Sequence, residues 1–343
     1  PWALRDPRTG ARHPLQVCEG IDGPELLCSL PLAALEARTY EASDEPVPGG
    51  SPWEVSAEIL DNGLVRAEID LYGRIDRLCF AGRFVDLDGP LLQAGCDDQV
   101  LAVTPARIQV IEDGPVRARV QATIETARGV VHLIYTLQAF DPSLRITVAW
   151  DGTPPQAWLD LSTRNLRRPH WRSNGYAAEA LSTSAGMATW LHCDDGQGGG
   201  LGIGGLHPLH LTVAKGACRL GVRPGLGFAL SDPHLVDPAL LAETCLVRGI
   251  GTAGSIPAPC PTTLVGLEGV ARPWARRCPD GSGEILLVEQ HGRRSRGWLR
   301  GTGSRAWLCD LRGRPLRDLA RTPEDDAWQV DLTAGGIACL RWR

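Results

Sequence analysis

The chain has 343 residues, 43% of them hydrophobic, which is enough apolar material to bury a core and excludes wholesale disorder. Its 40 glycines and 26 prolines favour many short strands and turns over long helices. The net charge of −5 argues against nucleic acid as a partner, because proteins that bind polyanions carry an excess of basic residues.

The cysteines and the N-terminal residues indicate the cellular compartment of the protein. The 11 cysteines are odd in number and irregularly spaced, without a CxxC pair, which argues against a disulfide framework or a zinc ribbon. Scattered buried thiols in a reducing cytoplasm fit better. No run of about 18 apolar residues predicts a membrane span. Residues 1–6 are no signal peptide and lack Met, so we expect the chain to begin inside a longer bacterial gene product or after a trim.

Alternation of apolar and polar residues is the clearest structural signal. Alternation at 65–71, followed by Tyr72-Gly73, predicts a strand and a turn. The same pattern over 116–125, 131–139 and 144–150 predicts a three-stranded antiparallel meander with one buried face and one wet face. A helix would spread these apolar residues around its axis, so strands are favoured.

Composition also divides the chain into parts. Linker-like stretches lie at 45–52 and 249–261, and the one helix candidate covers 238–248. Short strands between Gly-rich breaks are predicted in the tail at 284–289, 297–300, 306–311, 328–332 and 337–342. We therefore predict an all-β protein with three parts: a lead-in β segment over 1–48, a large antiparallel super-β-sandwich over 53–250 and a small β-sandwich over 262–343.

Four stretches of the chain carry a family pattern. They are LPLAALEARTY at 30–40, LDNGLVRAEID at 60–70 followed by GRI at 73–75, EDGPVRAR at 112–119 and GIACLR at 336–341. In this order they resemble the C-terminal half of the α-mannosidases of glycoside hydrolase family 38. Glu36 departs from the pattern, in which glycine is usual at that place.

The resemblance implies a galactose-mutarotase-like super-β-sandwich flanked by smaller β domains, as part of a retaining, zinc-dependent hydrolase of α-mannosides. In that family the zinc and the nucleophilic aspartate belong to an α/β barrel N-terminal to this region, followed by a helical bundle. No stretch of this sequence reads as alternating βα units. We therefore expect no catalytic residue, no metal ligand and no cofactor in this chain, the zinc being held by the absent barrel.

The resemblance also implies partners. These are the catalytic barrel of the same polypeptide and, through the whole enzyme, a carbohydrate of the α-mannoside type; a homo-oligomer stays open. On this hypothesis the chain supports the barrel and is inactive alone. The alternative is a free-standing carbohydrate-binding or assembly module on the mutarotase-like fold. A mutarotase proper needs a His and a Glu as acid and base across a sugar ring, and no such pair aligns here.

The densest aromatic and polar stretch, residues 169–176, is the candidate sugar-contacting loop. Trp171 and Tyr176 offer faces for sugar C–H groups, while Arg172 and Asn174 offer directional hydrogen bonds to hydroxyls. Three readings stay open: sugar contact, a seam with a catalytic domain, or an ordered loop with a packed Trp and a paired Arg. Two roles are likewise open for the 11 tryptophans: stacking on sugar rings or, more commonly, packing in the core and at interfaces.

The triplet His192-Cys193-Asp194 has the H-x-D form of the family's zinc motif, but it lies deep in the β region, and zinc needs three or four converging ligands. We interpret it as a polar strand end, predict no metal there and keep Asp194 and Asp195 as further candidate sugar contacts.

The Gly-rich loop 196–200 lacks the Gly-Lys-Ser/Thr ending of a phosphate-binding loop and predicts a hairpin turn.

Overall fold

Strands make up all of the regular structure that the computed structural model describes. The described residues are 3–20, 23–30, 39–47, 53–87, 89–96, 99–101, 104–151, 157–161, 167–172, 179–180, 185–194, 200–214, 217–222, 226–236, 263–267, 270–271, 275–278, 282–289, 293–301, 303–311, 313–322, 327–334 and 336–343. They contain strands and no helix, which confirms the all-β fold class. Nothing in this part of the chain is therefore a helix with the length and apolar character to span a membrane. The helix candidate 238–248 and the stretch 249–261 lie outside the described residues.

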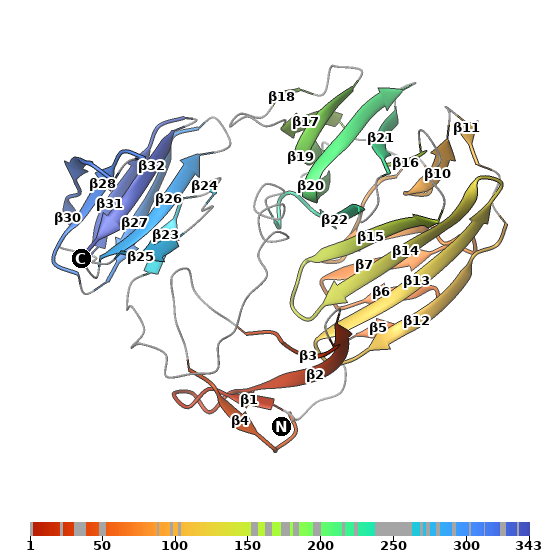
Figure 1. The fold of residues 1–343 in the computed structure, drawn as a ribbon, viewed down its shortest axis with the longest axis horizontal. Helices are drawn as coiled ribbons and strands as arrows, with labels where there is room; N and C mark the ends of the chain where they lie inside the picture. The colour runs from red at the N-terminus through yellow and green to blue at the C-terminus, as the bar shows by residue number, and fades with distance from the viewer. Residues whose placement is uncertain are drawn as a thin grey trace. The chain divides into compact units, whose positions relative to one another are not determined.

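The described residues fall into two compact units (Figure 1). The first unit includes the described residues from Ala3 to Ser29 and from Glu41 to Val236, and the second those from Thr263 to Arg343, with Leu30, Thr39 and Tyr40. Each unit has its own hydrophobic core.

Three sheets build the first unit. The four-stranded lead-in sheet has the order β3-β2-β1-β4, with β1 (Ala3–Arg5), β2 (Arg12–Gly20), β3 (Gly23–Cys28) and β4 (Glu41–Ser43). The five-stranded sheet runs in chain order through β5 (Glu54–Val55), β6 (Ile59–Asp61), β7 (Val65–Ile69), β8 (Ile75–Phe80) and β9 (Arg83–Phe84).

The largest sheet has 13 strands, and its path is β11-β10-β16-β21-β20-β22-β15-β14-β13-β12. These strands are β10 (Gln93–Cys96), β11 (Gln99–Val100), β12 (Arg107–Asp113), β13 (Arg117–Thr126), β14 (Gly129–Gln138), β15 (Ser143–Asp151), β16 (Ala157–Asp160), β20 (Gly200–Ala214), β21 (Ala217–Gly221) and β22 (Leu226–Ser231). Off this path, β17 (Arg167–Arg172) pairs with β18 (Glu179–Ala180) and with β19 (Ala185–Asp194), and β19 pairs with β20.

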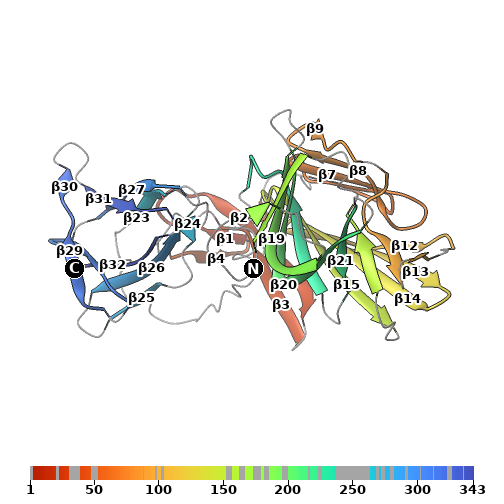
Figure 2. The ribbon, with the colours of Figure 1, turned by 90° about the horizontal axis from the view of Figure 1, so that it is seen from above.

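The five-stranded and 13-stranded sheets are two layers over one core. Figure 2 shows β7, β8 and β9 as a layer separate from β12 to β15. Leu60 and Phe80 come from the first sheet, Tyr135 and Leu191 from the second, and all four belong to the same buried cluster. Burial of such side chains is worth about 1.5–3 kcal/mol each, so this shared core holds the two layers together as a sandwich.

The predicted meander is β13, β14 and β15. Along β13 buried and half-exposed residues alternate, with Val120 and Ala122 fully buried between more exposed neighbours. The register pairs Val120 with Tyr135 and Tyr135 with Ile146, so one buried row crosses all three strands. The meander and its single wet face are therefore confirmed.

Asn62, from the second family-like stretch, connects two hairpins. Its side chain is 8% exposed, and its Nδ2 donates to the carbonyls of Gln138 and Asp141, both at 2.9 Å. Its Oδ1 accepts the backbone N–H groups of Leu64 at 3.0 Å and Val65 at 2.7 Å. One amide thus closes its own turn and ties it to the turn between β14 and β15, which is a structural role.

The turn after β7 is built in a similar way. Asp70 Oδ1 accepts the backbone N–H groups of Tyr72 and Arg74, each at 2.9 Å. Gly73 has a φ of +76°, and a Cβ there would lie 2.7 Å from the Cβ of Ala122. Tyr135, fully buried on β14, donates its hydroxyl to the Gly73 carbonyl at 2.7 Å, and burial raises the pKa of this phenol above its ordinary value of 10.0. Glycine is needed here for its backbone and for its size.

Gln16 joins the lead-in sheet to the third family-like stretch. Its Oε1 accepts the backbone N–H groups of Val116 at 2.9 Å and Arg117 at 2.7 Å. Its Nε2 donates to Glu112 Oε1 at 2.6 Å and to the Arg117 carbonyl at 2.9 Å. A Cβ at Gly114 would collide with the Gln16 amide, so the glycine leaves room for this contact.

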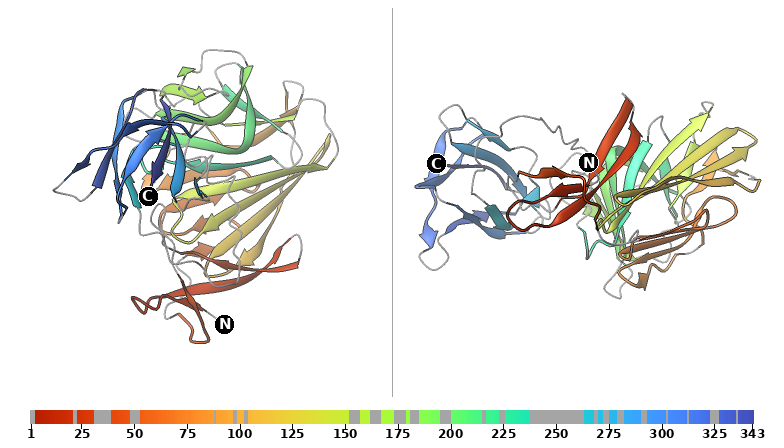
Figure 3. Two further views of the ribbon diagram at one scale, coloured as in Figure 1. Left: turned by 60° about the vertical axis from the view of Figure 1, so that its left-hand side comes forward. Right: turned by 90° about the horizontal axis from the view of Figure 1, so that it is seen from below.

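The second unit is a smaller sandwich (blue in Figure 3). Its four-stranded sheet has the order β23-β27-β31-β30, with β23 (Thr263–Gly266), β27 (Ser295–Arg300), β30 (Arg321–Thr322) and β31 (Ala327–Leu332). Its six-stranded sheet contains β24 (Val270–Ala271), β25 (Ala275–Arg277), β26 (Gly283–Glu289), β28 (Ala306–Cys309), β29 (Pro315–Asp318) and β32 (Ile337–Trp342). The five strands predicted in the tail correspond to β26, β27, β28, β31 and β32.

Candidate functional site

The predicted sugar-contacting residues fall on or beside β17 and β19. The backbone register pairs Trp171 with Leu191 and Arg172 with Trp190. Asp194 is the last residue of β19 and pairs with Gly200 of β20. Asn174, Tyr176 and Asp195 lie outside the described residues. The strands of Trp171, Arg172 and Asp194 are therefore neighbours, and sugar contact by these side chains stays a prediction.

The two faces of β19 differ sharply. Leu191 and Cys193 are fully buried in the core of the first unit. Because side chains alternate along a strand, Trp190 and His192 lie on the other face. Trp190 is 4% exposed and pairs in register with Gly204 of β20.

The buried Trp190 indole has no hydrogen-bond partner for its Nε1 among the described residues. A buried N–H group is normally satisfied, by protein, water or a ligand, because leaving it unpaired costs about 1–3 kcal/mol. Trp190 Nε1 is therefore a buried and unpaired donor on the strand next to β17.

His192 meets a second histidine on this face. The ring of His234 lies edge-on to it, with the ring centroids 6.3 Å apart. His234 belongs to a turn after β22, in which the Asp232 carbonyl accepts the N–H groups of Leu235 at 3.0 Å and Val236 at 2.9 Å. His192 is half-buried and His234 is exposed, so the pair is open to solvent on one side.

Asp232 holds this turn in place. Its side chain is buried, its Oδ1 accepts the His234 N–H at 2.9 Å, and its Oδ2 pairs with Arg83 of β9. Pairing and hydrogen bonds offset the cost of burying a carboxylate. Asp232 is therefore a positioning residue for His234, and its two oxygens are already committed.

No pattern in the sequence marks Arg83, Asp232 or His234 as site residues. Arg83 and Asp232 are 149 positions apart in the chain, and neither stands in a motif. Alternation predicts which residues of one strand share a face, but it carries no information about which turn meets which strand. Only the tertiary structure brings these three residues to the side of His192.

The described residues do not suit zinc at the His192-Cys193-Asp194 triplet. Cys193 points into the core, away from His192, and burial raises the pKa of its thiol above the ordinary value of 9.0. Zinc binds the thiolate, which this environment disfavours. No group of three or more His, Cys, Asp or Glu side chains able to hold a metal ion occurs in the part of the chain that the structure describes.

The cysteines and tryptophans of the described residues have structural environments. The nine described cysteines are free thiols, and eight of them are buried. Each tryptophan whose side chain is described is buried or half-buried, as with Trp158 at 7% and Trp328 at 2% exposure. These indoles are therefore packed against the protein, while the side chain of Trp171 is not among those described.

Comparison with known proteins shows which solved structures share the fold. No protein-family model matches the chain, and no curated protein matches it. Two solved structures match 99% of it: a protein in the glycosyl hydrolase family 38 from Enterococcus faecalis, with a TM-score of 0.68, and an alpha-mannosidase from Enterococcus faecalis V583, with a TM-score of 0.69. Sequence identity is 12% in both cases.

This likeness shows a shared fold. The chain has the layered β architecture found in these two glycosidase structures, over nearly its whole length. It spans 52% of the first protein and 51% of the second, so it corresponds to about half of each. What the other half of such a protein does is outside this chain.

Proposed function

We propose that this chain is the C-terminal, non-catalytic β region of an α-mannosidase-like glycoside hydrolase of family 38. The observation that carries the proposal is the match of 99% of this chain to about half of two proteins described as a family 38 hydrolase and an alpha-mannosidase. The family-like stretches at 60–75 and 112–119 add support, because their residues make the contacts that hold the sandwich and its lead-in sheet together.

In this role the chain packs against the catalytic barrel and supports it. The whole enzyme hydrolyses α-mannosides, and its catalytic barrel, with the zinc ion, is supplied by another part of the polypeptide. The proposal assigns no step of the reaction to this chain. The strands carrying Trp171, Arg172 and Asp194 then line either the substrate cleft or the seam with the barrel.

The experiment is an activity assay on the 343-residue chain, with and without the upstream part of the gene product. We expect no release of p-nitrophenol from p-nitrophenyl α-mannoside by this chain alone, and release when the chain is coexpressed with the polypeptide encoded upstream. Hydrolysis by the pure chain would contradict the non-catalytic role. A start codon directly before Pro1 would contradict the larger enzyme.

A second candidate is a free-standing carbohydrate-binding module. The observation that favours it is the solvent-accessible histidine pair of His192 and His234 beside β19. Titration calorimetry with mannose and manno-oligosaccharides separates the two candidates. Saturable binding that is weakened by His192→Ala, with no upstream barrel encoded, supports the module.

A further inference from the structure

The second unit contains a pocket that the proposed function does not use. It has a volume of about 430 Å³ and is lined by Arg294, Arg317, Asp331, Leu332, Thr333 and Ala334. Pockets for small ligands generally measure about 300–1,000 Å³, so this one suits a ligand the size of one sugar ring. Arg317 comes from β29 of one sheet, and Asp331 and Leu332 from β31 of the other.

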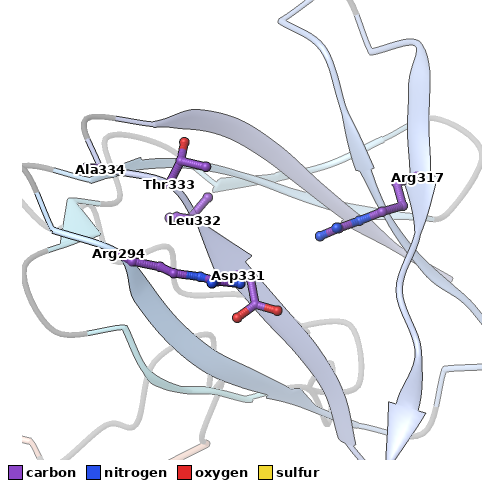
Figure 4. A pocket seen from close by; sticks show the side chains of 6 residues that line it. All are labelled: Arg294, Arg317, Asp331, Leu332, Thr333 and Ala334. Carbon is purple, nitrogen blue, oxygen red and sulfur yellow. The ribbon is translucent and has the colours of Figure 1, made fainter.

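Two guanidinium groups converge on this pocket. Figure 4 shows the ends of the Arg294 and Arg317 side chains pointing toward each other from opposite sides. Both residues are exposed, and neither has an ion-pair partner among the described residues. Like charges repel when they converge, and an anion between them removes that cost. The pocket therefore has unused positive charge directed to one place.

The single carboxylate of the pocket is already neutralised. Asp331 Oδ1 accepts a hydrogen bond from Arg296 Nε at 2.8 Å, and Oδ2 accepts one from Gln329 Nε2 at 2.6 Å. The bond from Arg296 lowers the pKa of Asp331 below its ordinary value of 3.8, so the carboxylate stays ionised and paired at neutral pH. Arg296 contributes most to this lowering, and the charge of Arg294 also acts on Asp331, so the three arginines around this one carboxylate leave the pocket with a net positive charge and Arg317 without an ion-pair partner among the described residues.

The rest of the pocket adds an apolar wall and a hydroxyl. Leu332 is 3% exposed and Ala334 stands beside Thr333 at the end of β31. The wider unit has the same sign of charge: residues 262–343 contain 14 arginines against 10 Asp and Glu, although the whole chain has a net charge of −5. A field of this sign attracts anions toward the second unit.

We propose that this pocket is a binding site for a small organic phosphate, with the phosphoryl group between Arg294 and Arg317 and the organic part against Leu332 and Ala334. Guanidinium groups bind phosphoryl oxygens through paired hydrogen bonds. A phosphoryl group carries about −1.5 to −2 charges at pH 7 and so matches two arginines better than a carboxylate does. The site does not depend on the function proposed above, since none of its residues belongs to the first unit.

Calorimetric titration of the full 343-residue chain with glucose 6-phosphate tests the site, at low ionic strength where screening is weak. Inorganic phosphate, glucuronate and glucose are titrated alongside. We expect saturable binding of glucose 6-phosphate, weaker binding of inorganic phosphate and glucuronate, and none of glucose. Saturable binding of glucose, tighter binding of glucuronate than of glucose 6-phosphate, or no heat with either phosphate overturns the proposal.

Variants locate the binding. Arg294→Gln and Arg317→Gln each weaken glucose 6-phosphate binding roughly tenfold, because each removes one charged donor. Arg314→Gln, which removes an exposed arginine outside the lining, leaves binding unchanged. Asp331→Asn removes the negative charge of the pocket and tightens binding of glucose 6-phosphate. A variant that merely disturbed the fold would weaken binding instead. If Arg314→Gln weakens binding as much as Arg317→Gln, the anion is held only by diffuse surface charge and the proposal fails.

Discussion

The two sandwiches of this protein are held together in different ways. In the first unit, buried side chains such as Asn62 and Tyr135 donate to backbone carbonyls of distant turns. In the second unit, prominent polar contacts are arginine pairs at the surface, such as Arg296 with Asp331 and Arg305 with Asp318. Both units bury some polar groups, as with Glu284 at 2% exposure in the second, so the contrast lies in the hydrogen bonds that join distant turns of the first unit.

This difference has consequences for stability and for function. A buried hydrogen bond that loses one partner leaves the other unsatisfied, whereas an exposed ion pair is replaced by water and salt. Substitutions at the turns of the first unit should therefore cost more than charge removal in the second. In the second unit, Arg317 is an exposed arginine without an ion-pair partner among the described residues, which suits it to serve a ligand.

The largest effect is expected at Gly73. Gly73→Ala forces a side chain into a positive-φ position and toward the Cβ of Ala122, and we expect a loss of about 3 kcal/mol. Gly63→Ala is the matched control, because Gly63 has a φ of +79° with open space around it, and it should cost about 1 kcal/mol. Urea unfolding measures both. Equal losses would show that crowding at Gly73 is unimportant.

Asn62→Ala should cost about 2 kcal/mol, since it removes two donated and two accepted hydrogen bonds from a buried position. The control is Gln121→Ala on the wet face of β13, for which a change within about 0.5 kcal/mol is expected. Urea unfolding gives the free energies, and hydrogen exchange shows whether protection is lost in β14 and β15. Unchanged exchange in those strands would argue against the link between hairpins.

Tyr135→Phe should cost about 1 kcal/mol, because it leaves the Gly73 carbonyl without its donor. It also changes the response to alkali. Burial raises the pKa of Tyr135 in the folded state, whereas in the unfolded chain this phenol ionises near pH 10.0. Above that pH, ionisation stabilises the unfolded chain, so the free energy of unfolding decreases as the pH rises. Buried thiols such as Cys193 add a similar fall from about pH 9.0.

The measurement is the unfolding midpoint between pH 8 and pH 11. Tyr135→Phe should show a smaller alkaline decrease than the unmodified chain, while Tyr72→Phe, at a partly exposed position, should show the same decrease as the unmodified chain. Parallel curves for Tyr135→Phe and the unmodified chain would mean that this phenol does not resist ionisation.

The smallest effect is expected in the second unit. Arg296→Gln removes a half-exposed ion pair with Asp331 and should cost about 0.5 kcal/mol, less in high salt. Because Arg296 lowers the pKa of Asp331, the pair stabilises the fold above pH 3.8 and this contribution is lost as the pH falls through the lowered value. Acid unfolding should therefore be shallower in the variant. A loss above that of Asn62→Ala would reverse the comparison between the two units.

Much of the fold was predictable because strand periodicity is local. The alternation over 116–150 specifies which side chains are buried, and β13 to β15 have that arrangement. The resemblance marked Asn62 and Gly73 without giving their roles. Those roles depend on partners far along the chain, such as Gln138 and Tyr135, and no local pattern identifies them.

The site was less predictable than the fold. That Trp171 and Asp194 lie on paired strands follows from the register of β17 with β19, in which Trp171 is opposite Leu191 and Asp194 is opposite Arg167, and no local pattern in the sequence specifies this pairing. The sequence by itself determined that this is an all-β chain with a net negative charge and scattered free thiols, since composition and period-two patterning are properties of the linear chain. Only the tertiary structure decided that Asp232 positions His234 beside His192, and that Arg294 and Arg317 share a pocket, because long-range contacts arise when sheets stack and turns meet.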